Sequence, residues 1–517
     1  MTSQERRVKN AICDRLMQEG VGVRPDDDAV ERTCALTELA VELGRPDGVE
    51  RALRWHEALE KRDIKGENGI ILDLSRANAV AGKRYGTQWT WEQPTLAREI
   101  YYLRRALSRP DFLEATEVTR CKVLNNLGNR LSVAGRAIEA LHYWRSGLEI
   151  QPNFGMSLCN RAKVLAEYGS ALEDADERAL FFWIAHKEAS AALAQAAIYT
   201  DPRDQGSREM AKQIKERIES FMNHRGIDEF DPQRRYLELD TSTSEEERSY
   251  RRWCVSNYLF LNPANDVYPR VAVVSDGLQL PIHVIPVDSP HFFSSFFDQL
   301  VQEYVSARWS LYEALARREP HLSDRDVPLY ASEPRAALSL AVERLKTAYR
   351  TAYSLFDKIG FFVNAYMELG IPEKKVSFRT VWRPDEKKPI RQQFNSSDNW
   401  GFCALHWLSK DFFEEENDEV AEPHARQLSD IRNHIEHKYL RVTMDENPVS
   451  PPQDLALMVS RKQFEEKTTH LLKLARAALT YLSVGVGFEE KRRAPSRIGI
   501  KLEEIPPVPF LSNSEKN

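Results

Sequence analysis

The stretch from Leu338 to Tyr366, LSLAVERLKTAYRTAYSLFDKIGFFVNAY, decides the fold class of the C-terminal half of the chain. Apolar side chains recur along it in steps that alternate between four and three residues, the spacing of a continuous buried stripe on a long α-helix. The stripe predicts one seam of a helical bundle. Its positions are Leu338, Val342, Leu345, Tyr349, Ala352, Phe356, Ile359, Val363 and Tyr366.

Helical patterns continue on both sides of this seam. Amphipathic stretches predict further helices at residues 291–318, 400–413, 423–441 and 455–482. The last residues are polar and rich in proline, which predicts a loose tail. We therefore expect a bundle at residues 291–488 and a polar tail at residues 489–517.

The predicted helix at 423–441 carries an unusual set of polar residues. At about 100° per residue, Asn433 and His437 stack one turn apart, opposite the apolar stripe, and Arg432 lies on its flank. Arginine binds phosphate through a bidentate fork, and histidine exchanges a proton near neutral pH. These residue types in this spacing predict a site for a phosphodiester. The stripe consists of Leu428, Ile431, Ile435, Tyr439 and Val442.

Two neighbours on the same helix are candidate supporting residues. His434 would line the same cleft. Glu436, one turn after Arg432, is expected to orient the guanidinium through an ion pair, as residues at this spacing commonly do.

The N-terminal third contains the stretch CKVLNNLGNRLSVAGRAIEALHYWRSGLEIQP, from Cys121 to Pro152, which resembles a tetratricopeptide repeat. Small Gly128 and Ala140 would let two antiparallel helices approach closely, and Trp144 would fill the groove between them. Weaker matches to the same repeat pattern lie before and after this stretch. We predict a repeat array over residues 1–225, with a plain helical bundle without repeats as the alternative.

Between these regions the composition changes to a polar junction near residues 225–245. Residues 226–290 are predicted to be a linker and docking segment between the repeat array and the bundle. The stretch from Arg270 to Val287 has two β-rich runs around a turn and predicts a short hairpin, although two prolines weaken it. The expected fold class is therefore all-α, with at most this hairpin between the repeat array and the bundle.

Composition describes an ordinary globular chain of 517 residues, 42% hydrophobic and 29% charged. Its length predicts roughly two to four domains. The net charge of −6 means that any nucleic-acid site must be a local basic patch. The six scattered cysteines indicate reduced core residues, and neither a signal peptide nor a membrane-spanning stretch is expected, so we predict a cytoplasmic protein with no membrane partner.

The motif on the predicted helix at 423–441 resembles that of the HEPN superfamily of ribonucleases, in which an Arg, a polar residue, three further residues and a His lie on a bundle helix. The repeat-like region, together with the stretch RWC…LFLNPANDVYP at residues 252–269, is similar to the tetratricopeptide-fused branch. The resemblance implies that Arg432 and His437 are the catalytic pair, that Asn433 supports them, and that Asp357 is the acidic residue of an earlier helix. It also implies a homodimer with two motifs in one cleft.

A zinc site is an alternative use of the histidines. Cys403 and His406, together with His434 and His437, offer four side chains of the types that zinc prefers. Against this, Cys403 and His406 lie in an aromatic stretch where packed side chains of both types are common, and no carboxylate-rich second shell is in register. We expect no metal and no other cofactor. Motifs typical of kinases, dehydrogenases and serine hydrolases are absent from the sequence.

The predicted function is a metal-independent endoribonuclease of the toxin or defence type, which cuts RNA by attack of the substrate's own 2′-hydroxyl. A protein or peptide partner on the repeat-like region would regulate or target it. The alternative is a non-catalytic interaction scaffold whose bundle serves only to dimerise.

Overall fold

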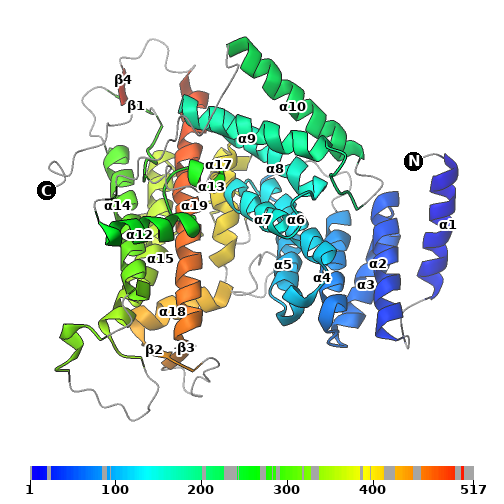
Figure 1. Ribbon diagram of the computed structural model, residues 1–517, viewed down its shortest axis with the longest axis horizontal. Helices are drawn as coiled ribbons and strands as arrows, with labels where there is room; N and C mark the ends of the chain where they lie inside the picture. The colour runs from blue at the N-terminus through cyan, green and yellow to red at the C-terminus, as the bar shows by residue number, and fades with distance from the viewer. Residues whose placement is uncertain are drawn as a thin grey trace. The chain divides into compact units, whose positions relative to one another are not determined.

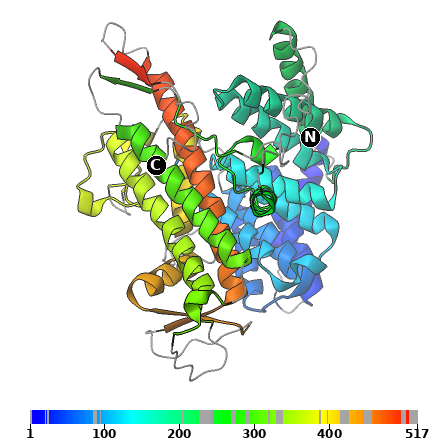
Figure 2. The same ribbon diagram turned by 60° about the vertical axis from the view of Figure 1, so that its left-hand side comes forward.

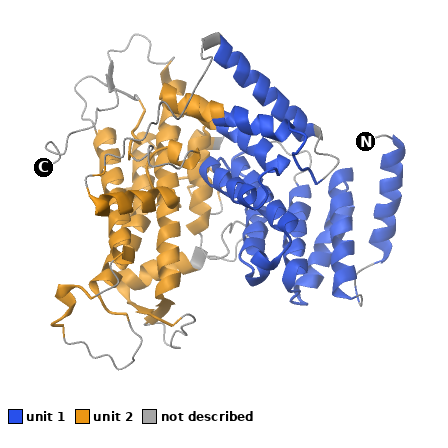
Figure 3. Cartoon of the chain, in the orientation of Figure 1, with its two compact units in different colours: residues 1–166, 184–226, 413–425 blue, residues 167–183, 227–412, 426–517 orange. Residues whose placement is uncertain are grey.

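The computed structural model describes residues 3–19, 22, 25–83, 90–93, 95–200, 205–225, 242, 244–267, 275–281, 283–286, 292–316, 320–327, 337–384, 388–395, 397–412, 425–445, 456–494 and 502–505. The chain divides into two compact units (Figure 3). Unit 1 contains residues 1–166, 184–226 and 413–425, and unit 2 contains residues 167–183, 227–412 and 426–517. The domain limits expected from the sequence stay a prediction.

Unit 1 is built from helices that pair with their neighbours along the chain (Figure 1). Short connections force such neighbours to run antiparallel. The helices are α1 (Ser3–Glu19), α2 (Asp26–Leu43), α3 (Pro46–Glu60), α4 (Gly66–Gly82), α5 (Leu96–Leu107), the 3₁₀ turn η1 (Pro110–Glu114), α6 (Glu117–Val133), α7 (Ala137–Ile150), α8 (Gly155–Ala171), α9 (Ala175–Leu193) and α10 (Gln205–Arg225). Residues 167–183, at the end of α8 and the start of α9, group with unit 2.

The pair α6 and α7 covers the frame that the sequence predicted. The indole of Trp144 lies directly over Gly128, where an added Cβ would come within 2.6 Å of the indole nitrogen. The same nitrogen donates a hydrogen bond to the carbonyl oxygen of Asn125 at 3.1 Å. Glycine is required here because no side chain fits under the ring. The array of paired helices is confirmed, and its membership of the tetratricopeptide family stays a prediction.

Unit 2 is centred on three long helices that lie side by side (Figure 2). They are α14 (Phe292–Ala316), α15 (Leu340–Tyr366) and α19 (Arg461–Arg493). Its other helical elements are α12 (Glu245–Ser256), α13 (Ala264–Val267), η4 (Leu322–Asp324), η5 (Glu373–Lys375), α16 (Gln392–Asn395), α17 (Trp400–Ser409), η6 (Lys410–Phe412) and α18 (Ala425–His437).

The predicted seam is the buried side of α15. Every stripe position from Val342 to Tyr366 is buried, whereas Leu338 precedes the helix and is 42% exposed. Helix α15 begins after Ser339, whose side chain accepts a hydrogen bond from the backbone N–H of Val342 and so caps the helix. The four-three spacing therefore predicted the interior of the helix correctly and its first residue wrongly.

Two small sheets add to the helices. Strand β1 (His283–Pro286) pairs antiparallel with β4 (Leu502–Ile505), and β2 (Tyr439–Thr443) pairs in parallel with β3 (Ala456–Ser460). The all-α prediction otherwise holds for the described part of the chain. Of the predicted hairpin between Arg270 and Val287, residues 270–274 lie outside the described residues, and the second run is β1, whose described partner is the tail strand.

The sequence prediction also misplaced two helix ends. The helix expected at 423–441 ends at His437, and residues 439–443 form β2 because Leu440 and Val442 are buried with a period of two. The helix expected from 455 begins at Arg461, after β3, and it continues to Arg493. The predicted loose tail therefore begins with the last turn of α19 and also contains β4.

Helix α19 is the core helix of unit 2. By length and composition alone it could cross a membrane, which corrects the expectation that no stretch is apolar enough, but 83% of its most apolar window is buried within the protein. The close contact between α19 and α17 depends on two glycines, since a Cβ on Gly401 would lie 2.5 Å from the backbone nitrogen of Gly485.

Candidate active site on helix α18

Helix α18 is fixed to the bundle through its apolar side. Leu428 and Ile431 are buried, and the hydroxyl of Tyr349 on α15 donates a hydrogen bond to the carbonyl oxygen of Leu428 at 2.8 Å. Asn433 is half-buried and His437 is exposed, as expected for the opposite face. Ile435 is half-buried and Tyr439, the next position of the predicted stripe, is exposed because it already belongs to β2.

Two contacts orient the guanidinium of Arg432. Its Nη1 donates a hydrogen bond to Oδ1 of Asn433 at 3.1 Å, and the group lies 5.8 Å from the ring centre of Tyr353. The amide of Asn433 also approaches the hydroxyl of buried Ser429, at 3.5 Å. The amide and the ring hold the cation from two sides and leave its remaining N–H groups available to an anion.

Arg432 lines a cavity of about 190 Å³ between α15 and α18. Asp357, which the family resemblance singled out, lines the same cavity, and its Oδ1 accepts a hydrogen bond from the backbone N–H of Phe378 at 3.1 Å. Arg432 and Asp357, both selected from the sequence, thus line one cavity. The lining residues are Arg350, Tyr353, Ser354, Asp357, Lys358, Phe361, Arg432 and Glu436.

Glu436 also faces this cavity, but its ion pair differs from the expected one. Its carboxylate lies 3.8 Å from the guanidinium of Arg350 on α15, and the predicted pair with Arg432 is not formed. The reason is that Arg432 turns toward Asn433 and Tyr353 instead. Glu436 therefore offsets the charge of Arg350, and among the described residues no carboxylate forms an ion pair with Arg432.

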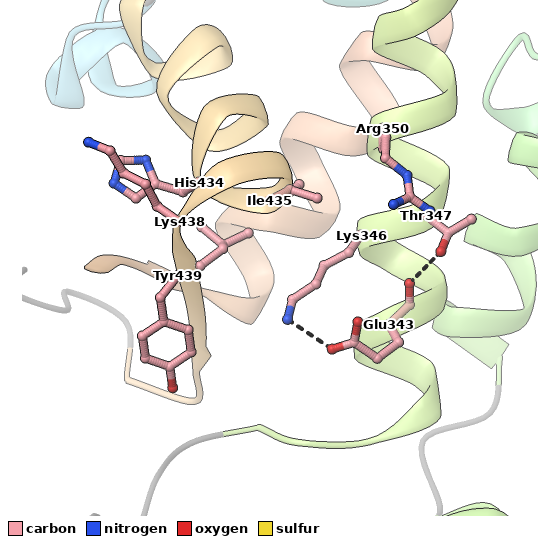
Figure 4. A pocket seen from close by; sticks show the side chains of 9 residues that line it. Glu343, Lys346, Thr347, Arg350, His434, Ile435, Lys438 and Tyr439 are labelled. Atoms are coloured by element: carbon pink, nitrogen blue, oxygen red, sulfur yellow. Dashed lines mark hydrogen bonds and ion pairs between the residues drawn. The ribbon is translucent and has the colours of Figure 1, made fainter. Parts of the chain in front are cut away.

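His434 lines a different cavity, of about 170 Å³ (Figure 4). Its Nδ1 lies 2.7 Å from the carbonyl oxygen of Asp430 and donates a hydrogen bond to it, because a carbonyl oxygen can only accept. The expectation that His434 shares the cleft of Arg432 is corrected to a neighbouring cavity.

His437 lines neither of these two cavities and is exposed. Among the residues that the structure describes, no hydrogen-bond partner or ion-pair partner of His437 is found. One chain therefore brings Arg432, Asn433 and Asp357 together and leaves His437 facing outward from the same helix.

The four side chains of the zinc alternative do not converge. Cys403 and His406 are buried in α17, next to the rings of Trp382 and Trp407, whereas His437 is exposed on α18. Within the described ranges, no group of three or more His, Cys, Asp or Glu side chains could hold a metal ion. Burial lowers the pKa of His406 well below its usual value and raises that of Cys403, so both are packed as neutral groups.

Sequence reasoning selected Asp357 on α15 but missed its neighbours at this site. Arg350, Tyr353 and Asp357 recur at three- and four-residue intervals, and Lys358 follows Asp357 directly, so these residues share one side of the helix. That spacing was a usable signal, but charged residues on a helix opposite its apolar stripe ordinarily indicate a solvated face.

Comparison with known families assigns the region that holds this site. Residues 286–489 match the family model described as LA2681-like HEPN. This part of the chain is an LA2681-like HEPN domain. The HEPN domain includes α14, α15, α18 and most of α19, and it contains every candidate site residue. HEPN domains are often ribonucleases. Comparison of the chain with curated proteins and with solved structures found no match.

Proposed function

We propose that this protein is a metal-independent endoribonuclease whose reaction is carried out by Arg432, Asn433 and His437. The observation that carries the proposal is the guanidinium of Arg432, which a 3.1 Å hydrogen bond to Asn433 holds at a cavity lined by two further cations, Arg350 and Lys358, within a HEPN domain. A preoriented arginine is well suited to a phosphate whose negative charge grows during reaction.

The proposed reaction uses the 2′-hydroxyl of the RNA as the nucleophile. A base takes the 2′ proton while the 2′-oxygen bonds to phosphorus, and the bond from phosphorus to the 5′-oxygen breaks as an acid donates a proton to that oxygen. The products are a 2′,3′-cyclic phosphate and a 5′-hydroxyl. His437 serves as one of the two proton-transfer groups, a role typically worth about 10²–10⁴-fold in rate. Arg432 stabilises the charge on the non-bridging oxygens.

A homodimer would complete the site. Arg432 and His437 lie on different sides of α18, and His437 lines neither of the two cavities found beside this helix in the described part of the chain. If the Asn433 and His437 faces of two copies meet across a two-fold axis, each histidine approaches the arginine of the other copy. Each of the two sites would then combine the arginine of one copy with the histidine of the other, and the interface would exclude water from the phosphate.

The wider role remains part of the proposal. Arrays of paired helices offer extended surfaces for other proteins, and unit 1 contains such an array. A protein or peptide partner there would restrain or direct cleavage, which fits a cytoplasmic toxin or defence effector.

A non-catalytic scaffold is the second candidate. It is favoured by the exposure of His437, for which the described ranges contain no hydrogen-bond partner. A scaffold would need the dimer but not the free guanidinium of Arg432, so RNA cleavage distinguishes the two functions.

The proposal is tested by incubating the full-length protein with total RNA and with defined tRNAs in EDTA. Cleavage is expected, and single-stranded DNA should survive because it lacks the 2′-hydroxyl. Arg432→Ala and His437→Ala should each slow cutting by about 10²-fold or more. His470→Ala, which alters an exposed histidine on α19, is the matched control. Absence of cleavage with every RNA would favour the scaffold.

A further inference from the structure

A second cationic cavity lies beside the candidate active site, between α15 and the junction of α18 with β2 (Figure 4). Its volume is about 170 Å³. Lys346 and Arg350 reach it from α15, four residues apart and so about 6 Å along the axis. The other lining residues are Glu343, Thr347, His434, Ile435, Lys438, Tyr439 and Leu440.

The charge around this cavity differs in sign from that of the chain. Three permanent cations, Lys346, Arg350 and Lys438, line the cavity together with one carboxylate, Glu343, whereas the whole chain has a net charge of −6. The side chain of Lys438 extends from the end of α18 away from Lys346 and Arg350 (Figure 4). Lys346 is paired with Glu343 at 2.8 Å. For Lys438, the part of the chain that the structure describes provides neither an ion pair nor a hydrogen bond. The cavity is therefore a local basic site of the kind that a phosphate backbone needs.

Arg350 joins this cavity to the candidate active site, because it lines both. Its side chain is 52% exposed, and its ion pair with Glu436 is long, at 3.8 Å. A half-exposed guanidinium with one loose partner can turn toward a phosphate in either cavity. Arg432, Arg350 and Lys346 thus form a continuous row of cations from one cavity to the next.

An aromatic ring stands at the far end of this row. Tyr439, the first residue of β2, lines the second cavity and is 48% exposed. Exposed rings beside a row of cations are the usual arrangement by which proteins bind single-stranded nucleic acid, since bases stack on the rings while the cations follow the backbone. Cavities of about 170 and 190 Å³ have room for a phosphate group and not for a duplex.

We propose that the second cavity binds the phosphate next to the cleaved bond of a single-stranded RNA, with Arg350 shared between the two phosphates and Tyr439 stacked on a flanking base. The proposal rests on the proposed function for the identity of the ligand. It assigns Arg350, Lys346 and Lys438 to substrate binding, whereas Arg432 and His437 belong to the chemical step. Glu343 limits affinity by competing for Lys346.

Binding can be measured without cleavage by using a 2′-O-methyl single-stranded oligonucleotide, which has no 2′-hydroxyl to attack. Fluorescence anisotropy of a labelled 12-mer in EDTA is the readout, with full-length protein. Lys438→Ala and Arg350→Ala should each weaken binding by about fivefold or more. Each should also reduce the steepness of the plot of log affinity against log salt by about 0.7, the value for one lost phosphate contact to a single strand.

The controls separate this site from general charge effects. Lys491→Ala removes an exposed cation near the C-terminal end of α19. It should change neither the affinity for the oligonucleotide nor the slope of the salt plot. Arg350→Lys should restore part of the binding, and Glu343→Gln should strengthen it by freeing Lys346. Tyr439→Phe should bind like the wild type, whereas Tyr439→Ala should lose roughly fivefold or more.

The test of the second cavity as a binding site does not depend on whether RNA is cut. If the wild type cuts RNA but Lys438→Ala and Arg350→Ala bind the oligonucleotide as Lys491→Ala does, the second site is overturned and the proposed function survives. If no RNA is cut but these variants still weaken binding selectively, the binding site stands and the proposed chemistry falls. Failure of the wild type to bind, or tighter binding of a duplex than of the single strand, overturns the site.

Discussion

Nη1 of Arg432 donates a hydrogen bond to Oδ1 of Asn433 at 3.1 Å, although the two side chains leave α18 about 100° apart. This contact holds the guanidinium against the helix, where it faces the cavity that contains Asp357. A free arginine would sample many rotamers, so the adjacent amide reduces the entropy lost when a phosphate binds.

Removal of either partner should therefore impair RNA cleavage to different degrees. Arg432→Ala is expected to reduce kcat by about 10²–10³-fold, as for other groups that stabilise a growing oxyanion. Asn433→Ala should reduce it by roughly tenfold to a hundredfold, since a hydrogen bond to a charged group is worth about 1.5–3 kcal/mol. Single-turnover cleavage of a labelled RNA measures both. Equal rates for Asn433→Ala and wild type would show that the amide does not position the arginine.

Self-association should be visible in solution and in mixing experiments. Light scattering at micromolar concentration should give about twice the mass of one chain. If each site combines Arg432 of one copy with His437 of the other, Arg432→Ala and His437→Ala proteins, each inactive alone, should regain about a quarter of the wild-type rate when mixed, because half of the dimers are mixed and each has one intact site of two. A single-chain mass, or no recovery after exchange, argues against the shared site.

The stability of unit 2 should depend on a buried ion pair between α19 and α13. Arg476 is 2% exposed and lies 2.6 Å from Oδ1 of Asp266; it also donates to the carbonyl oxygens of Phe260 and Asn262. Arg476→Ala leaves a buried carboxylate without its cation and should cost about 3–5 kcal/mol.

Chemical denaturation followed by tryptophan fluorescence measures this cost. The matched control is Lys491→Ala, which removes an exposed cation from the same helix. Surface substitutions usually change stability by no more than about 0.5 kcal/mol, so the control should remain close to wild type. Equal losses of unfolding free energy for the two variants would contradict the stabilising role of the buried ion pair.

Unit 1 should lose stability in mild acid through His56. Burial lowers the pKa of His56 to about 3, with Arg76 and Arg105 adding to the effect. The unfolded chain takes up this proton near pH 6.5 and the folded chain does not, so the free energy of unfolding falls as the pH drops from about 6.5 toward 3. The slope from this one group reaches about 1.4 kcal/mol per pH unit.

A pH series of denaturation curves tests this sign. His56→Gln removes the titrating group and should give a shallower fall between pH 6.5 and 4, even if the variant is less stable at pH 7. His56 lies within hydrogen-bonding distance of Thr37 and Ser75, at 3.2 and 3.4 Å, and glutamine can retain one of these contacts. Parallel pH curves for the two proteins would contradict the assignment.

How much the sequence predicted can be argued from single elements. The interior of α15 followed from its apolar spacing, because that period decides which side chains are buried. The end of α18 did not, because Val442 fits a helical stripe and also, together with Leu440, an alternating strand. Strand β2 exists through its pairing with residues 456–460, a distant contact that a local pattern does not reveal.

The candidate site was likewise predicted from the sequence only in part. Arg432, Asn433 and Asp357 could be selected from the sequence, and the structure places them around one cavity or in direct contact. Arg350 was not selected, because its spacing also fits a solvated helix face and its place between two cavities depends on how α15 and α18 pack. The position of His437 outside both cavities was equally hidden, since a helical wheel gives a side chain's direction and not what it meets.

The central claim is that RNA is cut by its own 2′-hydroxyl at the Arg432 and His437 site. The most direct measurement uses an oligoribonucleotide with one 2′-deoxy nucleotide at a mapped cleavage position, incubated with the protein in EDTA, and identifies the product ends by mass spectrometry. The account predicts a 2′,3′-cyclic phosphate and a 5′-hydroxyl from the all-ribose strand, and no cutting at the 2′-deoxy position. Products with a 5′-phosphate and a 3′-hydroxyl, cutting at the 2′-deoxy position, or unchanged cutting by His437→Ala would contradict it.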